Sequence, residues 1–134
     1  MRWPEIISPG QSISNIASTI DIYPTIANIL DDKIEGYAND GVSLLPLLNG
    51  EKNSNPRNEL YYYYGEKLIA VRKEEWKLVF PHVYRSYKGV EPGGNLHPGP
   101  YNKGQSGLEL YNLSNDIGET TDVAGLFPNI VKEL

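Results

Sequence analysis

The sequence contains no cysteine and only two histidines, and both shortages exclude classes of chemistry. Without cysteine the chain forms no disulfide framework, thiolate metal site or cysteine nucleophile. His82 and His97 lie far apart beside prolines, which is not the spacing of a histidine metal site. A glycine-rich phosphate loop and a nucleophile elbow are also missing. The sequence motifs therefore identify no catalytic residue and no metal ligand.

Long apolar runs and basic clusters are missing as well. No run approaches the roughly 20 residues that span a bilayer, and no secretory signal pattern opens the chain. The net charge is -5, and no cluster of lysine and arginine stands out, which argues against binding to nucleic acid. We therefore expect neither a nucleic-acid partner nor a membrane partner.

The strongest positive signal is a run in the middle of the chain that is rich in aromatic and β-branched residues. It predicts three strands, at 59–64, 67–73 and 76–80, with a tight Gly65-Glu66 hairpin between the first two. One face of the middle strand is apolar and the other is mixed, so we expect an antiparallel meander covered on one side. Alternate residues share a face, so two of the four tyrosines at 61–64 are expected in the core.

Helical and further strand signals flank this meander. A helix is expected at 22–30, with Asp21 as its N-cap. Residues 108–113 alternate like a fourth strand, and 127–134 begin a terminal helix. Between the meander and the fourth strand, 81–107 reads as a long irregular loop, which in a compact domain is usually functional or disordered.

These elements together predict an α+β fold, a four-stranded antiparallel sheet with flanking helices. A linker-like composition at 51–58 places a boundary between a leading segment, 1–55, and a sheet subdomain, 56–134. The chain opens on a segment that contains proline and glycine and has no element to anchor it. We therefore expect this chain to be a piece of something larger.

Candidate binding residues gather in the loop at 81–107, where a rigid sheet would hold donors and aromatic rings. Arg72 lies on an apolar strand face and needs a carboxylate, carbonyl or phosphate-like partner, for which a structural ion pair is the simpler account. A plain surface is the alternative interpretation of the loop. Its candidates are His82, Tyr84, Arg85, Tyr87, Lys88, His97 and Tyr101.

Four groups of short motifs, in order along nearly the whole chain, resemble those of sulfatases. They are R-W-P at 2–4 with D-I-Y-P-T-I at 21–26, D-G-V-S-L-L-P-L-L-N-G at 40–50, A-V-R at 70–72 with W-K-L at 76–78, and L-Y-N-L at 110–113 running into D-I-G-E-T-T-D-V-A at 116–124. The chain thus resembles the C-terminal region of an arylsulfatase-type enzyme of the alkaline-phosphatase-like superfamily. Asn112 and Ile117 stand where this family usually has Asp and Pro, which affects only turn detail.

The resemblance implies a larger α/β parent that hydrolyses sulfate esters with a bound Ca²⁺ and a formylglycine made from a C/S-x-P-x-R motif. That motif does not occur in this chain, and the family's metal-binding Asp and Asn residues belong to a preceding region. The chain is therefore expected to carry no cofactor and to be inactive alone. Its implied partner is the missing N-terminal catalytic domain, and the implied location of the parent is periplasmic or secreted.

In this family the C-terminal region forms a small four-stranded antiparallel sheet with a helix, packed against the catalytic domain, and a variable loop reaches toward the substrate mouth. By this resemblance His82, Arg85 and His97 are candidates for contacting a sulfated small molecule or glycan. Segment 1–55 becomes the trailing segment of the catalytic domain. Without that domain the apolar stripe at 13–30 should be exposed, and the chain should self-associate.

Two alternatives remain open at this point. A free-standing module would bind anionic glycans through the tyrosine-rich sheet and the basic loop, and saturable binding weakened by Arg85→Ala would identify it. A fragment of a related phosphodiesterase or phosphonate hydrolase would share the D-x-x-P-T run. The tail after Leu110 favours a sulfatase over that second alternative.

Overall fold

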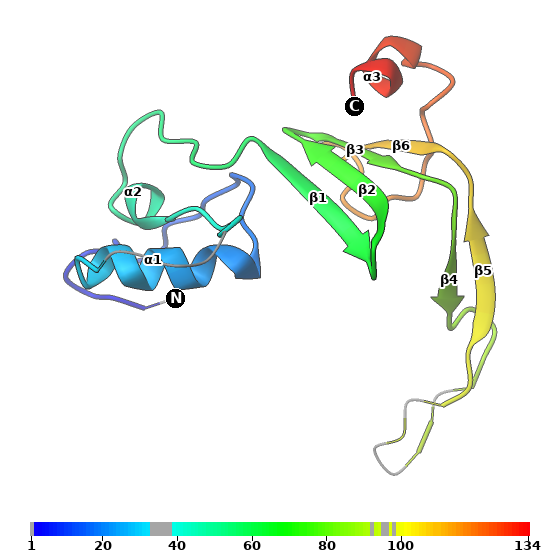
Figure 1. Cartoon of the computed structure of the whole chain (residues 1–134), viewed down its shortest axis with the longest axis horizontal. Coiled ribbons are helices and arrows are strands. Elements are labelled where there is room, and N and C mark those ends of the chain that lie inside the picture. Colours follow the sequence, from blue (N-terminus) through cyan, green and yellow to red (C-terminus); the bar gives the residue numbers. More distant parts are fainter. Residues whose placement is uncertain (1, 33–38, 92, 95–96, 98) are drawn as a thin grey trace. The chain divides into compact units, whose positions relative to one another are not determined.

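The computed structural model describes residues 2–32, 39–91, 93–94, 97 and 99–134, which form two compact units, Met1–Leu60 and Tyr61–Leu134 (Figure 1). Among the described residues, none of the helices has both the length and the apolar character required to cross a membrane.

The first unit consists of short helices. The 3-10 turn η1, Thr19–Asp21, leads into α1, Ile22–Ile29, and a single turn, α2, follows at Leu45–Leu48. α1 therefore forms where the 3- and 4-residue spacing of apolar residues predicted it, and Pro24 lies in its first turn, where a missing N–H costs little.

Asp21 is the N-cap residue of α1, as predicted, but its side chain does not cap the helix. Asp21 itself has helical backbone angles, and its carboxylate makes no cap hydrogen bond to α1. The carboxylate instead accepts hydrogen bonds from two backbone amides outside α1, that of Ser18 at 2.8 Å and that of Val42 at 3.0 Å. It also pairs with the guanidinium of Arg57, whose Nε lies 3.0 Å from Oδ2. This side chain is fully buried.

Gly41 shows how tightly this unit closes around Asp21. A Cβ at Gly41 would clash with the carbonyl oxygen of Ile20, so only glycine permits this approach of the two segments. On the other side of the carboxylate, the Thr25 hydroxyl donates to the Asp21 carbonyl at 2.6 Å and accepts from the Leu44 amide at 2.9 Å. The D-x-x-P-T and D-G motifs are thus two halves of one hydrogen-bonded structure.

The second unit is built on a four-stranded antiparallel sheet. This confirms the predicted fold class, a four-stranded antiparallel sheet with flanking helices. Its order is β1-β2-β3-β6, so the last strand lies beside the third (Figure 1). Gly65 has a φ of 61°, as the predicted hairpin requires. The strands are β1 Glu59–Tyr64, β2 Lys67–Lys73, β3 Trp76–Val79 and β6 Glu109–Asn112, and the terminal helix is α3, Pro128–Glu133.

The sheet carries buried apolar residues on both faces, so the prediction that it is covered on one side is wrong. One face holds Val71, Leu78 and Leu110, against which Ile130 and Val131 of α3 pack. The opposite face holds a smaller cluster of Ala70, Val79 and Tyr111 with Tyr62 and Leu113.

The tyrosine run of β1 also differs from expectation. Only Tyr62 packs against a core cluster, whereas Tyr61, Tyr63 and Tyr64 are 51%, 62% and 67% exposed. Edge strands have neighbours on one side only, so alternation alone overestimates their burial. Tyr63 and Tyr64 therefore present largely exposed rings.

Residues 81–107 contain a β-hairpin, which corrects the prediction of an irregular loop. Strand β4, His82–Ser86, pairs with β5, Asn102–Ser106, in an antiparallel register that sets His82 opposite Ser106 and Arg85 opposite Lys103. Part of the connection between the strands (92, 95–96 and 98) lies outside the described residues. The β5 segment N-K-G-Q-S has little β propensity, and its pairing with β4 satisfies its backbone.

Candidate functional site

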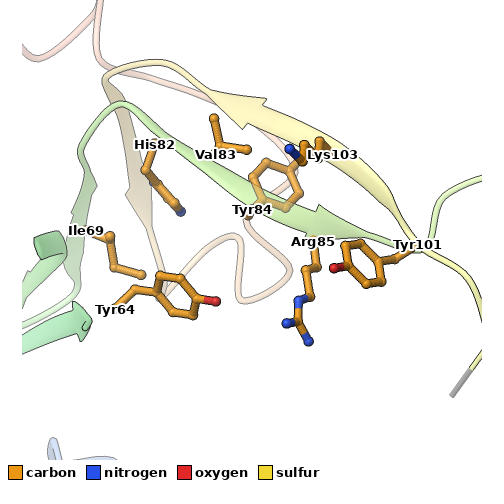
Figure 2. Close-up of a pocket in the computed structure, with 8 residues that line it drawn as sticks. All are labelled: Tyr64, Ile69, His82, Val83, Tyr84, Arg85, Tyr101 and Lys103. Carbon is orange, nitrogen blue, oxygen red and sulfur yellow. The ribbon is translucent and has the colours of Figure 1, made fainter.

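A cavity of about 430 Å³ lies where the β4–β5 hairpin meets β1 and β2, and we call it the hairpin cavity (Figure 2). This volume falls within the roughly 300 to 1,000 Å³ that is usual for small-molecule sites. Its wall combines aromatic rings, aliphatic carbon and cations, with no carboxylate among the described lining residues. These residues are Tyr64, Ile69, His82, Val83, Tyr84, Arg85, Tyr101 and Lys103.

His82 is fixed at the start of β4 by its neighbours. Its ring Nδ1 lies 2.8 Å from the carbonyl oxygen of Phe80 and 2.9 Å from the Ser106 hydroxyl. Because a carbonyl oxygen only accepts hydrogen bonds, Nδ1 carries the proton. Nε2 is then the nitrogen left for a ligand, as an acceptor in the neutral ring or a donor in the imidazolium.

Arg85 and Lys103 are directly opposite each other across the β4–β5 ladder. Like charges at opposed positions of an antiparallel pair are unfavourable. Within the described part of the chain, no carboxylate forms an ion pair with either residue. Figure 2 shows the guanidinium of Arg85 beside the Tyr101 ring. The guanidinium carbon lies 4.8 Å from the Tyr101 ring centroid, a cation–π contact.

Tyr84 lies flat across the partner strand because that strand has a glycine opposite it. Tyr84 is paired with Gly104, and a Cβ at Gly104 would lie 2.5 to 2.9 Å from three carbons of the Tyr84 ring. The ring centroids of Tyr84 and His82 are 6.0 Å apart. Gly104 thus leaves room for the Tyr84 ring, which is one of the residues that line the hairpin cavity.

A second, more polar cavity of about 280 Å³ adjoins the first and shares Ile69, His82 and Tyr84 with it. Lys77 pairs there with both carboxylate oxygens of Glu119, at 2.7 and 2.8 Å. Because these two charges already form an ion pair within the chain, we interpret this cavity as part of the fold and not as a ligand site.

Tyr111 lies in the same polar cavity and donates to Glu109 at 2.7 Å. Burial and this neighbouring carboxylate raise the pKa of Tyr111. The phenol therefore stays protonated and holds Glu109 in place.

The remaining sulfatase-like motifs turn out to contact one another. Lys77 of W-K-L pairs with Glu119 of the tail, and Trp76 packs on Phe127 with ring centroids 5.0 Å apart. Asp122 accepts a hydrogen bond from the Leu110 amide at 2.9 Å. Arg72 donates a hydrogen bond from Nε to the carbonyl oxygen of Glu74 at 3.1 Å. A carbonyl was one of the three kinds of partner predicted for this guanidinium. These motif residues serve the fold of the sheet.

The structure brings together two of the three predicted contact residues. His82 and Arg85 line the hairpin cavity, and His97, which is exposed in the connection between β4 and β5, does not. Tyr64, Ile69, Val83 and Lys103 line it without having been predicted. Lys103 is recognisable only from the cross-strand register, because its neighbours in the sequence give no strand signal.

A metal site is not evident in the part of the chain that the structure describes. No group of three or more His, Asp and Glu side chains is placed to hold an ion among those residues. The described residues therefore do not fit the Ca²⁺ that the sulfatase resemblance implies.

Comparison with known proteins gives a consistent result along the chain. The family model described as "N-sulphoglucosamine sulphohydrolase, C-terminal" matches residues 1–91. Arylsulfatase K of Xenopus laevis is 31% identical over 140 residues, which cover 96% of this chain and 22% of that protein. Arylsulfatase A of Homo sapiens is 30% identical over 141 residues, covering 98% of this chain and 27% of that protein.

A solved structure reported with the metabolism of multiple glycosaminoglycans by Bacteroides thetaiotaomicron has a TM-score of 0.65 and 25% identity. It covers 99% of this chain, which spans 26% of the solved chain. The chain therefore spans about a quarter of the length of such relatives. Since the family model matches more than half of it, this chain belongs to the sulfatases, as a C-terminal region of the N-sulphoglucosamine sulphohydrolase type.

Proposed function

We propose that this chain completes a sulfatase whose hydrolytic chemistry takes place in a preceding catalytic domain. The observation that carries the proposal is coverage: nearly the whole chain aligns with arylsulfatases, yet it spans only 22% and 27% of their length. The chain contains no C/S-x-P-x-R motif, so the formylglycine belongs to that preceding domain. The Ca²⁺ is assigned to the same domain, and the complete protein to the periplasm or the exterior of the cell.

The surface of α1 supports a preceding domain as the partner. Ile22, Ile26 and Leu30 are 47%, 50% and 69% exposed, although each is a large aliphatic residue. An apolar helix face of this kind is typical of an interface. In our proposal 1–55 is the trailing segment of the catalytic domain, 56–134 is the sheet subdomain, and the exposed face of α1 packs on the preceding part of the same polypeptide.

The hairpin supports a contribution to substrate binding. Strand β4 presents both His82 and Arg85 to the hairpin cavity, and the connection between β4 and β5 carries His97. Arginine and histidine donors suit the oxygens of a sulfate group, and the tyrosine rings suit a sugar. We assign to these three residues contacts with the sulfated substrate, and to the rest of the chain the scaffold that holds them.

The test begins upstream of Met1. We expect the reading frame to extend into a catalytic domain with C/S-x-P-x-R, and the extended protein to hydrolyse 4-nitrocatechol sulfate. The same protein with Ala at the Cys or Ser of that motif is the control, and the 134-residue chain alone should release no sulfate. An extended, folded protein that lacks the motif and hydrolyses no sulfate ester would overturn the proposal.

A further inference from the structure

The β4–β5 hairpin continues the β3–β6 pair of the sheet past a break. Val79, the last residue of β3, is paired with Glu109, the first residue of β6. Segment 80–81 leads from β3 into β4 and segment 107–108 leads from β5 into β6, and we call these two segments the hinge. Beyond the hinge β4 and β5 form a separate two-stranded sheet, which turns away from β3 and β6 (Figure 1). Because Pro81 has no N–H, it cannot carry the ladder across.

Ser106, the last residue of β5, holds the first hinge segment. Ser106 is buried, and its hydroxyl accepts a hydrogen bond from the His82 amide at 3.3 Å and donates to the Phe80 carbonyl oxygen at 3.4 Å. Nδ1 of His82 donates to the same carbonyl at 2.8 Å and lies 2.9 Å from the Ser106 hydroxyl. The Phe80 amide still bonds to Ile69 of β2 at 2.9 Å. Phe80 is therefore tied to the sheet through its amide and to both strands of the hairpin through its carbonyl.

Glu109, the first residue of β6, holds the second hinge segment. Its Oε1 accepts a hydrogen bond from the Gly107 amide at 3.0 Å, and its Oε2 accepts one from the Tyr111 hydroxyl at 2.7 Å. Tyr111 is buried on the sheet in the cluster with Ala70 and Val79. The carboxylate thus joins the backbone of the hinge to a side chain that the core of the sheet holds in place.

We propose that Ser106 and Glu109 are positioning residues, which fix the direction of the β4–β5 hairpin relative to the sheet. Hinge residues absorb changes in φ and ψ, so without these hydrogen bonds the hairpin would take several directions. The hairpin carries Arg85 and Lys103, and its direction decides where these two cations lie. That their place matters for contact with a substrate rests on the proposed function, whereas the hinge contacts do not depend on it.

The test is a distance measurement by pulsed electron spin resonance between a label on the hairpin and a label on the sheet. The chain has no cysteine, so Asn102→Cys in β5 and Lys132→Cys in α3, both at exposed positions, take the labels selectively. α3 packs on the sheet, and dilution with unlabelled protein keeps the measured distances within one chain. We expect one narrow distance distribution for the labelled 134-residue chain. Ser106→Ala and Glu109→Leu should each widen it about twofold.

Two control variants separate the hydrogen bonds from other effects of substitution. Glu109→Gln keeps both contacts, because its Oε1 still accepts from the Gly107 amide and its amide group can donate to the Tyr111 oxygen. Ser114→Ala removes an exposed serine hydroxyl beyond the far end of β6. Both should leave the distribution narrow. The Tm is measured for each variant, since a purely stabilising role would lower the Tm without widening the distribution.

A distribution that stays narrow in both Ser106→Ala and Glu109→Leu would overturn the proposal, whatever their Tm. Equal widening in Glu109→Gln and Glu109→Leu would also overturn it, as would a broad distribution in the labelled chain without further substitution. Should Ser106→Ala not fold, the comparison of Glu109→Gln with Glu109→Leu decides. These distances are independent of hydrolysis: an extended protein without sulfatase activity would refute only the proposed function, and unchanged distances would refute only the role of Ser106 and Glu109.

Discussion

Asp21 joins segments that lie far apart in the sequence, and its ion pair sets the stability of the first unit. Its carboxylate is buried, and the Arg57 side chain that it pairs with is only 10% exposed. Removing one partner of such a pair leaves the other charge uncompensated, which typically costs about 3 to 5 kcal/mol. We expect Asp21→Ala to destabilise the first unit by an amount in this range, measured by hydrogen exchange of the α1 amides.

The control for this variant is an exposed carboxylate in the same unit. Asp32→Ala should change stability by less than about 0.5 kcal/mol, as surface substitutions usually do. Equal effects of the two substitutions would show that Asp21 contributes nothing beyond its charge.

The same carboxylate makes the first unit sensitive to acid. Burial raises the pKa of Asp21, but hydrogen bonds from Arg57, Val42 and Ser18 outweigh it, so the pKa is lower in the fold than in the unfolded chain. Its contribution is therefore present above the unfolded value of about 3.9 and is lost as the pH falls through the folded pKa.

We expect the exchange protection of α1 to fall steeply below about pH 4 in the wild type, where Asp21 takes up its proton. Asp21→Asn starts less protected, because it lacks the charge, and should show a flatter dependence on pH. Parallel curves for the two proteins would place the acid-sensitive group elsewhere.

At the scale of elements, the β4–β5 hairpin depends on a missing side chain. A Cβ at Gly104 would press on the Tyr84 ring, so Gly104→Ala must move the ring or part the strands. Such overpacking typically costs about 1 to 3 kcal/mol, and we expect a lower Tm in thermal unfolding. At Gly107 the nearest atom would be 4.0 Å away, so Gly107→Ala is the control and should leave the Tm unchanged.

The elements differ in how far their own sequence determines them. Strands β1, β2 and β3 follow from local aromatic and β-branched runs, and their predicted positions agree with the structure within one residue. Strand β5 has no such run and exists because β4 pairs with it, which no local pattern reveals. For the same reason Lys103 was not predicted as a lining residue. The ion pair of Asp21 was not predicted either, because its partner Arg57 lies in a distant segment of the sequence.

At the scale of the whole molecule, the motifs shared with sulfatases fall into two internal networks rather than into a catalytic centre. One surrounds Asp21 in the first unit, and the other joins Lys77 to Glu119 beside the sheet. The first network satisfies a buried charge, and the second pairs two partly exposed charges within this chain. The chain therefore makes its own contacts within each of two compact units, and α1 carries a group of exposed aliphatic residues.

These exposed residues predict how the 134-residue chain behaves in isolation. Ile22 and Ile26 are about half exposed on α1, and apolar surface of this kind lowers its free energy by being removed from water. We expect concentration-dependent self-association in analytical ultracentrifugation, reduced by Ile26→Lys without a loss of Tm. Leu126→Lys, at a residue that is 75% exposed in the second unit, should leave the association unchanged. In the extended protein Ile26→Lys should instead lower the Tm, because the catalytic domain would cover that residue. A chain that stays monomeric at all concentrations and binds no apolar dye would refute α1 as a docking surface.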